Sequence, residues 1–394
     1  MKKLLVISFS EIQNDPRVYR QVQLLREQYQ VTVAGLGSCP MSGIEWVAIN
    51  TPSRTLLDRL VYVALCGLRQ FEKAYWGRSV HRVALSLFEG RKFDLILAND
   101  LDALPLALRI AVHSPVLLDA HEYAPLENED SFLWRLTVQP YKEYLCRTYL
   151  HRTGGMLTVC DGLADEYARV YGVKPKLLMS APVYQSLTPS RVDERQIRLI
   201  HHGGAMPGRH LESMIEMMDC LDERFTLDFM LVPNDANYLV KLKRRAATHP
   251  RVRFLEPVPM LEISRTINNY DIGVYILKPN NFNNAHALPN KFFEFVQARL
   301  GIAIGPSPEM AHLVKLYELG VVANDFTPQA LAERLNALTT ADIVKFKEAA
   351  NIAAQELCFE KNAEVLLGEV ERLMPMGPTV PAEQQEIIVA ALRG

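Results

Sequence analysis

The sequence lacks an excess of charge of either sign. Its 394 residues include 43 Lys or Arg and 45 Asp or Glu, which gives a formal net charge of −2. A protein that binds nucleic acid mainly through phosphate contacts carries an excess of basic residues. The balance therefore argues against a nucleic-acid partner, and any basic surface has to be local.

Long hydrophobic runs are also lacking. The longest strongly apolar run, Leu60–Leu68, has about half the residues that a membrane-spanning helix needs. Met1–Ser10 begins like the basic region of a signal peptide, but Glu11 and Asn14 follow too early for its apolar region. We therefore expect neither a transmembrane helix nor a signal peptide, and we predict a cytoplasmic protein whose first residues form a buried strand.

Cysteine is scarce and shows no paired spacing. The chain has six cysteines, and its sequence contains no Cys-x-x-Cys pair. Such pairs are typical of zinc sites, and dense cysteine patterns are typical of small secreted proteins with disulfides. The cysteines thus predict a reducing compartment and no metal cage.

A dinucleotide-binding motif is missing as well. The residues after the first predicted strand, Ser8-Phe-Ser-Glu-Ile-Gln-Asn-Asp-Pro-Arg17, lack the Gly-x-Gly-x-x-Gly pattern, which argues against a dinucleotide oxidoreductase. Asp15 and Pro16 are instead typical of a helix start, with Asp15 as the N-cap. Arg17 is explained less well in this way, because a cation is unfavourable at the positive end of a helix. It is therefore a candidate binding residue.

Short runs rich in Val, Ile and Leu alternate with amphipathic stretches along most of the chain. This alternation is typical of parallel sheets connected by helices. We therefore predict the α/β class, with two tandem Rossmann-like, doubly wound domains facing a cleft. The expected parts are an N-terminal domain (1–183), a linker (184–197), a second domain (198–360), a C-terminal helix (361–374) that could return to the first domain, and a tail (375–394).

A glycine-rich turn follows the first strand of the second domain. It reads Gly203-Gly204-Ala-Met-Pro-Gly-Arg209 and precedes a predicted helix. Glycines let a backbone approach a phosphate closely, and a helix N-terminus and Arg209 add positive charge. The alternative is an ordinary turn after a strand.

A second candidate site ends an asparagine-rich loop, at Leu288-Pro-Asn290-Lys291. Lys291 and Glu294 lie three residues apart and so share one face of a predicted helical turn, where one could bind a phosphate and the other a sugar hydroxyl. A carboxylate in a first helical turn is favourable without any ligand, whereas a lysine there is not. Lys291 is therefore the more informative of the two.

In their order along the chain, these motifs resemble those of retaining glycosyltransferases of the GT-B fold, family 4, and in particular its bacterial members that build surface polysaccharides. The resemblance extends over residues 3 to about 370. It rests on the motifs Asn14-Asp-Pro-Arg17, Ala98-Asn-Asp100, Asp119-Ala-His-Glu122, Gly203-Gly204…Gly208-Arg209 and Leu288-Pro-Asn-Lys-Phe-Phe-Glu294.

The resemblance implies roles for individual residues. Arg209 and Lys291 would bind the donor diphosphate, Glu294 would bind the donor ribose, and His121 would contact the donor sugar beside the reaction centre. The candidate catalytic residues are His121, Glu122 and Asp100. The candidate substrate-binding residues are Gly203, Gly204, Arg209, His286, Asn290, Lys291, Glu294 and Arg17.

Two positions depart from the family pattern. His286 stands where the family usually has the first glutamate of its Glu-x7-Glu motif, and Gly204 stands where many members have a second phosphate-binding arginine. The family's contacts to the donor sugar and the chemistry of that loop therefore do not carry over directly to this sequence, whereas those to the diphosphate are less affected.

The expected reaction is transfer of a hexose from a UDP- or GDP-sugar, with retention, to a saccharide or lipid-linked saccharide in polysaccharide or glycoconjugate biosynthesis. Fixed cations can stabilise the leaving nucleoside diphosphate, so we expect no cofactor and no metal. Asp100-Leu-Asp102 has the letters of a metal-binding Asp-x-Asp triplet but lies in the first domain. The alternatives are a nucleotide-sugar 2-epimerase of the same fold and a non-catalytic two-lobed sugar-binding protein.

Residues 54–92 are locally basic, with eight Lys or Arg against three Asp or Glu. A long helical stretch is predicted here, at Leu56–Phe88, with aromatic residues between the charges. Such a stretch could lie on an anionic membrane surface, with Tyr75 and Trp76 as anchors, and would then place the protein at the inner face of the cell membrane. The alternative is a packed helix with a solvated basic face.

Overall fold

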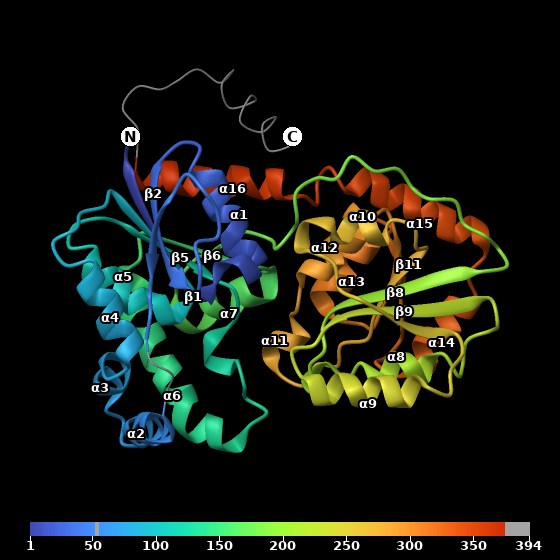
Figure 1. Cartoon of the computed structure of the whole chain (residues 1–394), viewed down its shortest axis with the longest axis horizontal. Helices are drawn as coiled ribbons and strands as arrows, with labels where there is room; N and C mark the ends of the chain where they lie inside the picture. The colour runs from blue at the N-terminus through green and yellow to red at the C-terminus, as the bar shows by residue number, and fades with distance from the viewer. Residues whose placement is uncertain (52–54, 375–394) are drawn as a thin grey trace. The chain divides into compact units, whose positions relative to one another are not determined.

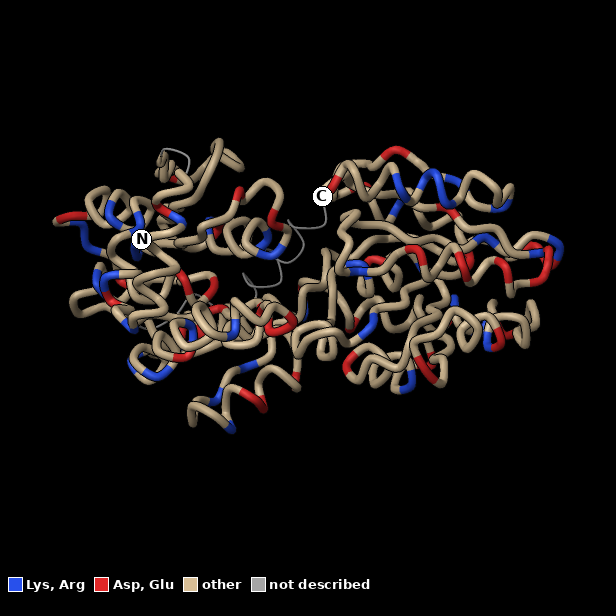
Figure 2. The backbone as a smooth tube through the Cα atoms, turned by 90° about the horizontal axis from the view of Figure 1, so that it is seen from below, with Lys and Arg blue, Asp and Glu red and all other residues tan. Residues whose placement is uncertain are grey.

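A computed structural model describes residues 1–51 and 55–374; Arg54 and the expected tail (375–394) lie outside the described residues. The chain divides into two compact units (Figure 1). Unit 1 combines Met1–Met179 with Asn281–Asn283 and the chain from Asn362 onward. Unit 2 combines Ser180–Asn280 with Asn284–Lys361. Basic and acidic residues are interspersed along both units, as the near-zero net charge implies (Figure 2).

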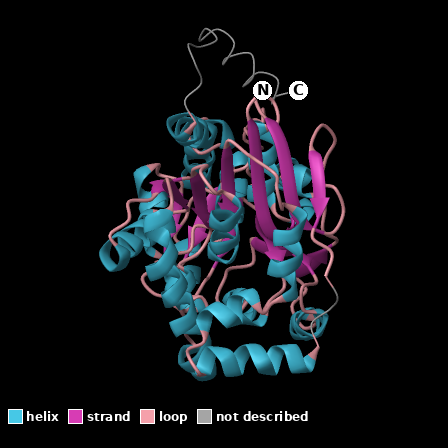
Figure 3. Cartoon of the chain, turned by 90° about the vertical axis from the view of Figure 1, so that its left-hand side faces the viewer, coloured by secondary structure: helices cyan, strands magenta, loops and turns pink. Residues whose placement is uncertain are grey.

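Unit 1 is built on a parallel sheet of seven strands in the order β3-β2-β1-β4-β5-β6-β7, with helices beside it (Figure 3). The central strand β1 begins with a continuous buried run from Leu4 to Ile7, which confirms the buried first strand. The strand order reverses between β1 and β4, and such sheets bind ligands at the carboxyl ends of the strands beside this switch point. The strands are β1 (Lys3–Glu11), β2 (Gln30–Leu36), β3 (Glu45–Ala48), β4 (Leu95–Asn99), β5 (Val116–Ala120), β6 (Gly155–Thr158) and β7 (Lys176–Leu177).

The helical stretch expected at Leu56–Phe88 is three helices, so the prediction of one long helix is wrong. The first of them ends where Arg69 adopts a left-handed backbone (φ 58°). The N–H of Gln70 then donates to the carbonyl of Leu65 (2.9 Å), which closes the helix end in the manner of a Schellman motif. Because glycine usually occupies that left-handed position, the arginine gave no stop signal. The helices of unit 1 include α1 (Pro16–Leu25), α2 (Leu56–Gly67), α3 (Phe71–Trp76), α4 (Ser79–Leu87), α5 (Leu104–Ile110), α6 (Phe132–Tyr149) and α7 (Asp161–Tyr171).

The two aromatic anchors predicted for a membrane surface both have partners within unit 1. Tyr75 is 1% exposed, stacks on the His81 ring at 3.8 Å and donates its hydroxyl proton to the carbonyl of Asp102 (2.7 Å). The prediction of Tyr75 as an interfacial anchor is therefore wrong. Trp76 donates to Glu72 (3.1 Å). Within the described part of the chain, no helix is both long and apolar enough to cross a membrane.

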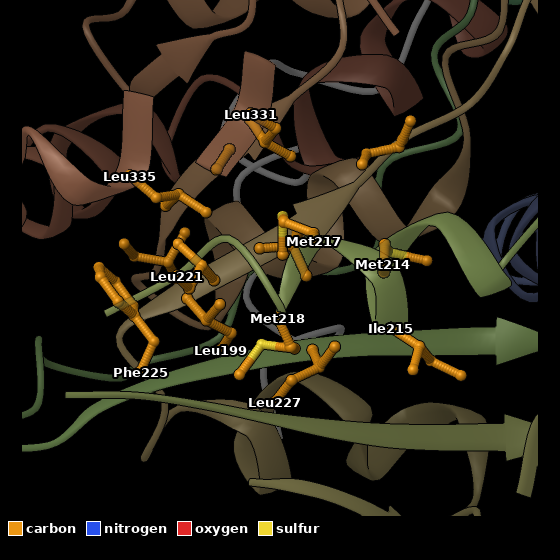
Figure 4. Close-up of a cluster of buried hydrophobic side chains, with 14 of the residues drawn as sticks. Leu199, Met214, Ile215, Met217, Met218, Leu221, Phe225, Leu227, Leu331 and Leu335 are labelled. Carbon is orange, nitrogen blue, oxygen red and sulfur yellow. The ribbon is translucent and has the colours of Figure 1, made fainter. Parts of the chain in front are cut away.

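Unit 2 is built on a parallel sheet of six strands in the order β10-β9-β8-β11-β12-β13, with its switch point between β8 and β11. Leucines from β8 and β9 pack against α8 and α14 in its core (Figure 4). The strands are β8 (Ile197–Gly204), β9 (Phe225–Val232), β10 (Val252–Leu255), β11 (Ile272–Tyr275), β12 (Gly301–Ile304) and β13 (Gly320–Val322). The helices include α8 (Glu212–Met217), α9 (Ala236–Ala246), α10 (Ile263–Ile267), α12 (Asn290–Gln297), α13 (Pro308–Leu316), α14 (Pro328–Asn336) and α15 (Thr340–Ala353), whereas the short α11 (Phe282–Ala285) begins in unit 1 and ends in unit 2.

The segment expected as a linker (184–197) belongs to unit 2; its backbone is irregular as far as residue 196, and Ile197 begins β8. Arg299 donates a hydrogen bond to the carbonyl oxygen of Gln185 (2.6 Å). The hydroxyl of Ser190 donates to the carbonyl oxygen of Asn268 (2.8 Å). Its polar and proline residues therefore mark the end of regular structure and form part of unit 2.

The last described helix, α16 (Phe359–Leu373), has most of its residues in unit 1. The side chain of Asn362 accepts a hydrogen bond from the backbone N–H of Met179 (2.8 Å). Further along, Arg372 donates to the carbonyl of Gly154 (2.8 Å), and Glu369 pairs with Lys176 (2.5 Å). These contacts bind α16 to the edge of the seven-stranded sheet that carries β6 and β7.

The packing of the unit 2 core predicts the effect of a cavity there. Leu199 on β8 is fully buried, so Leu199→Ala should lower the free energy of unfolding by about 2–5 kcal/mol in urea denaturation. Ile352→Ala is the control, because this side chain is 75% exposed and should change stability little. A loss below about 1 kcal/mol for Leu199→Ala would contradict the assigned packing.

Candidate functional site

Unit 2 gathers most of the predicted substrate-binding residues at its switch point. Strand β8 ends in His201-His202-Gly203-Gly204, and Arg209 follows in the next turn. Helix α12 brings Lys291 and Glu294 to the same place, since Lys291 contacts His201 and Glu294 approaches His202. We call this group the β8 site.

Lys291 is buried at the centre of the β8 site, with 5% of the residue exposed. Its amine lies 3.0 Å from Nε2 of His201 and 4.1 Å from the centre of the Tyr275 ring. The other ring nitrogen of His201, Nδ1, lies 2.8 Å from the carbonyl oxygen of Val274. Because a carbonyl only accepts, Nδ1 carries the proton, and Nε2 accepts a hydrogen bond from Lys291. Burial, and after it Lys291, lowers the pKa of His201 well below its usual value.

Two cations stand beside a glycine in this site. Gly203 has φ +118°, and a Cβ atom built there would lie 3.3 Å from the amine of Lys291 and 3.7 Å from Nη1 of Arg209. Glycine is therefore favoured here for two reasons: it adopts this backbone conformation without strain, and it has no side chain to crowd the two cations. Across residues 1–51 and 55–374, neither cation has a carboxylate within ion-pair distance. Burial, and after it Arg209, lowers the pKa of Lys291 well below its usual value, although Glu294 acts in the opposite direction. The arrangement suits a bound anion.

Glu294 is buried, with 6% of the residue exposed, in the middle of α12. One of its oxygens lies 3.5 Å from Nε2 of His202. Burial and the nearby Lys291 lower the pKa of His202 to about 3, so this imidazole is neutral near neutral pH. Glu294 thus keeps its carboxylate at the β8 site without a charged histidine beside it.

The two positions that depart from the family pattern have specific neighbours. Nδ1 of His286 lies 2.9 Å from a carboxylate oxygen of Glu309, in the first turn of α13. A side chain at Gly204 would collide with the amide of Asn234. Sequence reasoning missed both Glu309 and Asn234, because each comes from an element outside the motifs. Asn290, the last candidate of this unit, begins α12.

Unit 1 gathers its candidates at the carboxyl ends of β4 and β5. Asp100 follows β4, His121 follows β5, and α1 contributes Arg17. Their common partner is Asp119, which is fully buried in β5. We call this group the Asp119 site.

Arg17 and Asp119 form a buried, bidentate ion pair. Nε and Nη2 of Arg17 donate to the two carboxylate oxygens at 2.6 Å each, and Nη1 donates to the carbonyl of Leu178 at 2.6 Å. The amide of Gln21 also donates to Asp119. Burial alone would raise the pKa of Asp119, but Arg17 and His121 together outweigh burial and hold the pKa well below its usual value. The structure therefore places Arg17 as the partner of Asp119, and Asp15 caps α1 as expected through the N–H of Val18 (3.3 Å).

His121 lies between three polar side chains. Nε2 is 3.3 Å from a carboxylate oxygen of Asp119 and 3.2 Å from the amide oxygen of Asn99, and Nδ1 is 3.4 Å from Asp100. Burial alone would lower the pKa of His121, but Asp100 and then Asp119 outweigh burial and raise it to about 9. His121 is therefore an imidazolium near neutral pH.

The backbone at Asp100 is strained. Its φ of 64° with ψ of 159° is a conformation that residues other than glycine rarely adopt, at a cost of about 1–3 kcal/mol. The backbone N–H of Asp100 donates to the carbonyl of Asp119 (2.8 Å), and its carboxylate accepts from the N–H of His121 (3.0 Å). These bonds hold Asp100 against His121.

Glu122, the remaining catalytic candidate, is an exposed residue. Desolvation of its carboxylate, and after it the carboxylates of Glu127 and Asp100, raises its pKa to about 7. Sequence reasoning named Glu122, His121 and Asp100 but missed Asp119 as a site residue, although the quoted motif contained it.

The surroundings of His121 predict its titration. Since its pKa is raised to about 9 from about 6.5, the stability that it contributes is fully present below about pH 6.5 and is lost as the pH rises through about 9. An NMR titration should show the His121 imidazole losing its proton near pH 9. Asp119→Asn should lower this midpoint by more than about one pH unit, whereas Asp130→Asn, at an exposed position, should not. A midpoint near pH 6.5 in the wild-type protein would contradict the assigned contacts.

No family model matches the chain, and no curated sequence matches it. The structure of HepE from Anabaena in complex with UDP and glucose matches with a TM-score of 0.67 and 12% identity, over 94% of this chain and 100% of that one. A UDP-forming α,α-trehalose-phosphate synthase from Burkholderia vietnamiensis matches with a TM-score of 0.68 and 11% identity, over 97% and 100%. WaaG, a glycosyltransferase involved in lipopolysaccharide biosynthesis, matches with a TM-score of 0.64 and 14% identity, over 93% and 100%.

At such identities these matches establish the fold. The three proteins are similar to this chain over nearly its whole length. Together with the parallel sheets of seven and six strands, they confirm the predicted α/β class with two Rossmann-like, doubly wound units of the GT-B type.

Proposed function

We propose that this chain is a retaining glycosyltransferase that moves a hexose from a UDP- or GDP-sugar to a saccharide or lipid-linked saccharide acceptor. The observation that carries the proposal is the pair of cations at the β8 site. Lys291 and Arg209 lie beside Gly203 without a carboxylate partner among the described residues. A nucleoside diphosphate would supply the missing negative charge.

The chemistry of transfer needs this charge arrangement. The bond between the anomeric carbon and the diphosphate oxygen breaks with its electrons leaving on the diphosphate, which gains negative charge in the transition state. Fixed cations in a buried site stabilise such charge more than water does. Lys291 and Arg209 can do so without a divalent metal, so we propose that the reaction needs none. Glu294, on the same helix as Lys291, is the proposed partner of the donor ribose.

The Asp119 site is the proposed contribution of unit 1. His121 is the residue proposed to contact the donor sugar beside the reaction centre, and Asp119 with Arg17 would fix its position. Asp100 and Glu122 are the carboxylates available to an acceptor hydroxyl, since both stand next to His121 in the chain or in space. The acceptor itself, a saccharide or lipid-linked saccharide of glycoconjugate biosynthesis, is proposed from the sequence resemblance.

The structural neighbours support UDP as the first nucleotide to test. The HepE structure contains UDP and glucose, and a trehalose-6-phosphate protein from E. coli is bound to UDP-2-fluoro glucose. Those ligands belong to the neighbours. For this chain, thermal unfolding across a panel of nucleoside diphosphates and nucleotide sugars should show the largest stabilisation with the cognate donor.

Replacing either cation should weaken diphosphate binding selectively. Lys291→Met and Arg209→Met each remove a charge-assisted contact, so the affinity for UDP or GDP should fall by roughly 10- to 100-fold in calorimetry. The affinity for the uncharged nucleoside should change little. Lys241→Met on the exposed face of α9 is the matched control. Equal losses for nucleoside and diphosphate would show damage to the fold instead of loss of phosphate recognition.

Replacing His121 should affect turnover more than donor affinity. His121→Ala should cut turnover by at least roughly tenfold, with UDP or GDP affinity close to wild type. His113→Ala is the control, because His113 is an exposed histidine of the same unit. Wild-type turnover in His121→Ala would remove this residue from the site. An epimerised donor formed without any acceptor would instead favour the 2-epimerase alternative.

A further inference from the structure

The glycine turn after β8 has a polar neighbour from outside the sequence motifs. This neighbour is Asn234, in the loop between β9 and α9. A Cβ atom built on Gly204 would collide with the carboxamide of Asn234, although the backbone of Gly204 is not left-handed. Asn234 therefore occupies the space that a side chain at position 204 would take. Because Asn234 is an exposed residue, its carboxamide can reach a ligand that arrives from solvent.

Backbone hydrogen bonds fix the loop of Asn234 beside this turn. Strands β8 and β9 pair in parallel as far as Gly204 and Val232 (Figure 1). Beyond that point, the N–H of Ala205 donates to the carbonyl oxygen of Val232 (2.9 Å), and the N–H of Asp235 donates to the carbonyl oxygen of Ala205 (3.0 Å). The side chain of Asp235 then caps α9. The backbone thus holds Asn234 in place from both sides.

Three side chains with unused hydrogen-bond donors flank the two glycines. Among the residues that the structure describes, neither the carboxamide of Asn234 nor the guanidinium of Arg209 has a hydrogen-bond partner. The amine of Lys291 carries three donors and contacts one imidazole. Lys291 and Arg209 lie beside Gly203, and Asn234 lies beside Gly204. These donors suit one ligand that is rich in acceptor oxygens.

We infer that Asn234 binds the diphosphate of the donor, with its amide N–H groups donating to phosphate oxygens beside Lys291 and Arg209. The inference rests on the proposed function, because it names a third residue for the same anion. An amide adds a donor to the site without adding a like charge next to the buried amine of Lys291. A neutral side chain is therefore suited to this position.

Calorimetry of the full chain with UDP and GDP tests the inference. Asn234→Ala removes the donor, so the affinity for the nucleotide that binds more tightly should fall by roughly tenfold. Asn234→Asp keeps the shape of the side chain but places a carboxylate against the diphosphate. Its affinity should fall by at least roughly 100-fold, and its excess loss over Asn234→Ala should shrink as salt rises. The affinity for the uncharged nucleoside should change little in both variants.

Gly204→Ala tests the same contact from the other side. Its methyl group should displace the carboxamide of Asn234, which is exposed and can turn toward solvent. Nucleotide affinity should therefore fall more when Gly204→Ala is made in the wild-type protein than when it is made in Asn234→Ala. Equal losses in the two backgrounds would overturn the inference, because displacement of the carboxamide would then have no effect of its own.

Asn324→Asp is the matched control. Asn324 is an exposed asparagine of the same unit, in the loop after β13, so the substitution makes the same charge change away from the glycine turn. Its nucleotide affinity should equal that of the wild-type protein. Thermal unfolding without nucleotide should stay near wild type in all the asparagine variants, since both asparagines are exposed.

The inference and the proposed function fail in different ways. Absence of UDP and GDP binding by the wild-type protein would overturn the proposed donor, and the inference with it. Nucleotide binding that is weakened in Lys291→Met but stays at wild-type strength in Asn234→Asp would overturn the inference alone. Equal losses for nucleotide and nucleoside in Asn234→Asp would also overturn it, because the amide would then not act on the phosphates.

Discussion

The structure of the β8 site depends on one constraint: a lysine amine is buried at the switch point of a parallel sheet without a carboxylate to neutralise it. Lys291 instead donates to a neutral imidazole, His201, and lies over the ring of Tyr275. Burying a charge without a partner is expensive, and burial lowers the pKa of this amine well below its usual value, so a bound anion would offset that cost. Gly203 leaves the space that this anion needs. The glycine, the histidine and the helix that carries Lys291 thus all help to accommodate the buried amine.

At its own switch point, unit 1 buries a carboxylate and not an amine. Asp119 is a fully buried carboxylate, and Arg17 neutralises it with two parallel hydrogen bonds. The remaining negative charge of Asp100 keeps His121 protonated. One unit therefore buries an unpaired cation, and the other buries a neutralised pair with a charged histidine beside it. This difference suits a division of labour in which unit 2 binds a diphosphate and unit 1 contributes to the sugar or acceptor.

The sequence predicted the fold and the strand ends well, because apolar runs and motifs after strands are local signals. Lys291, Glu294 and Gly203 were identified from their spacing, and the structure brings them together. Side chains from other elements could not be predicted in this way: Glu309 pairs with His286 only because α13 passes that loop. The partner of Arg17 could not be predicted for the same reason, because it lies 102 residues away. The division of residues 56–87 into three helices was also missed, because an arginine in a left-handed conformation ends the first helix.

Proton uptake on nucleotide binding tests the central claim most directly, because it reports the charge of the Lys291 amine itself. Calorimetry of UDP binding would be run at about pH 8, where the diphosphate is fully ionised, in buffers of different ionisation enthalpy. Burial and Arg209 lower the pKa of the Lys291 amine, and a bound diphosphate should raise it again, so the wild-type protein should take up more protons per bound nucleotide than Lys291→Met. Equal proton uptake in the two proteins would contradict the claim that the diphosphate neutralises a buried, unpaired Lys291 amine.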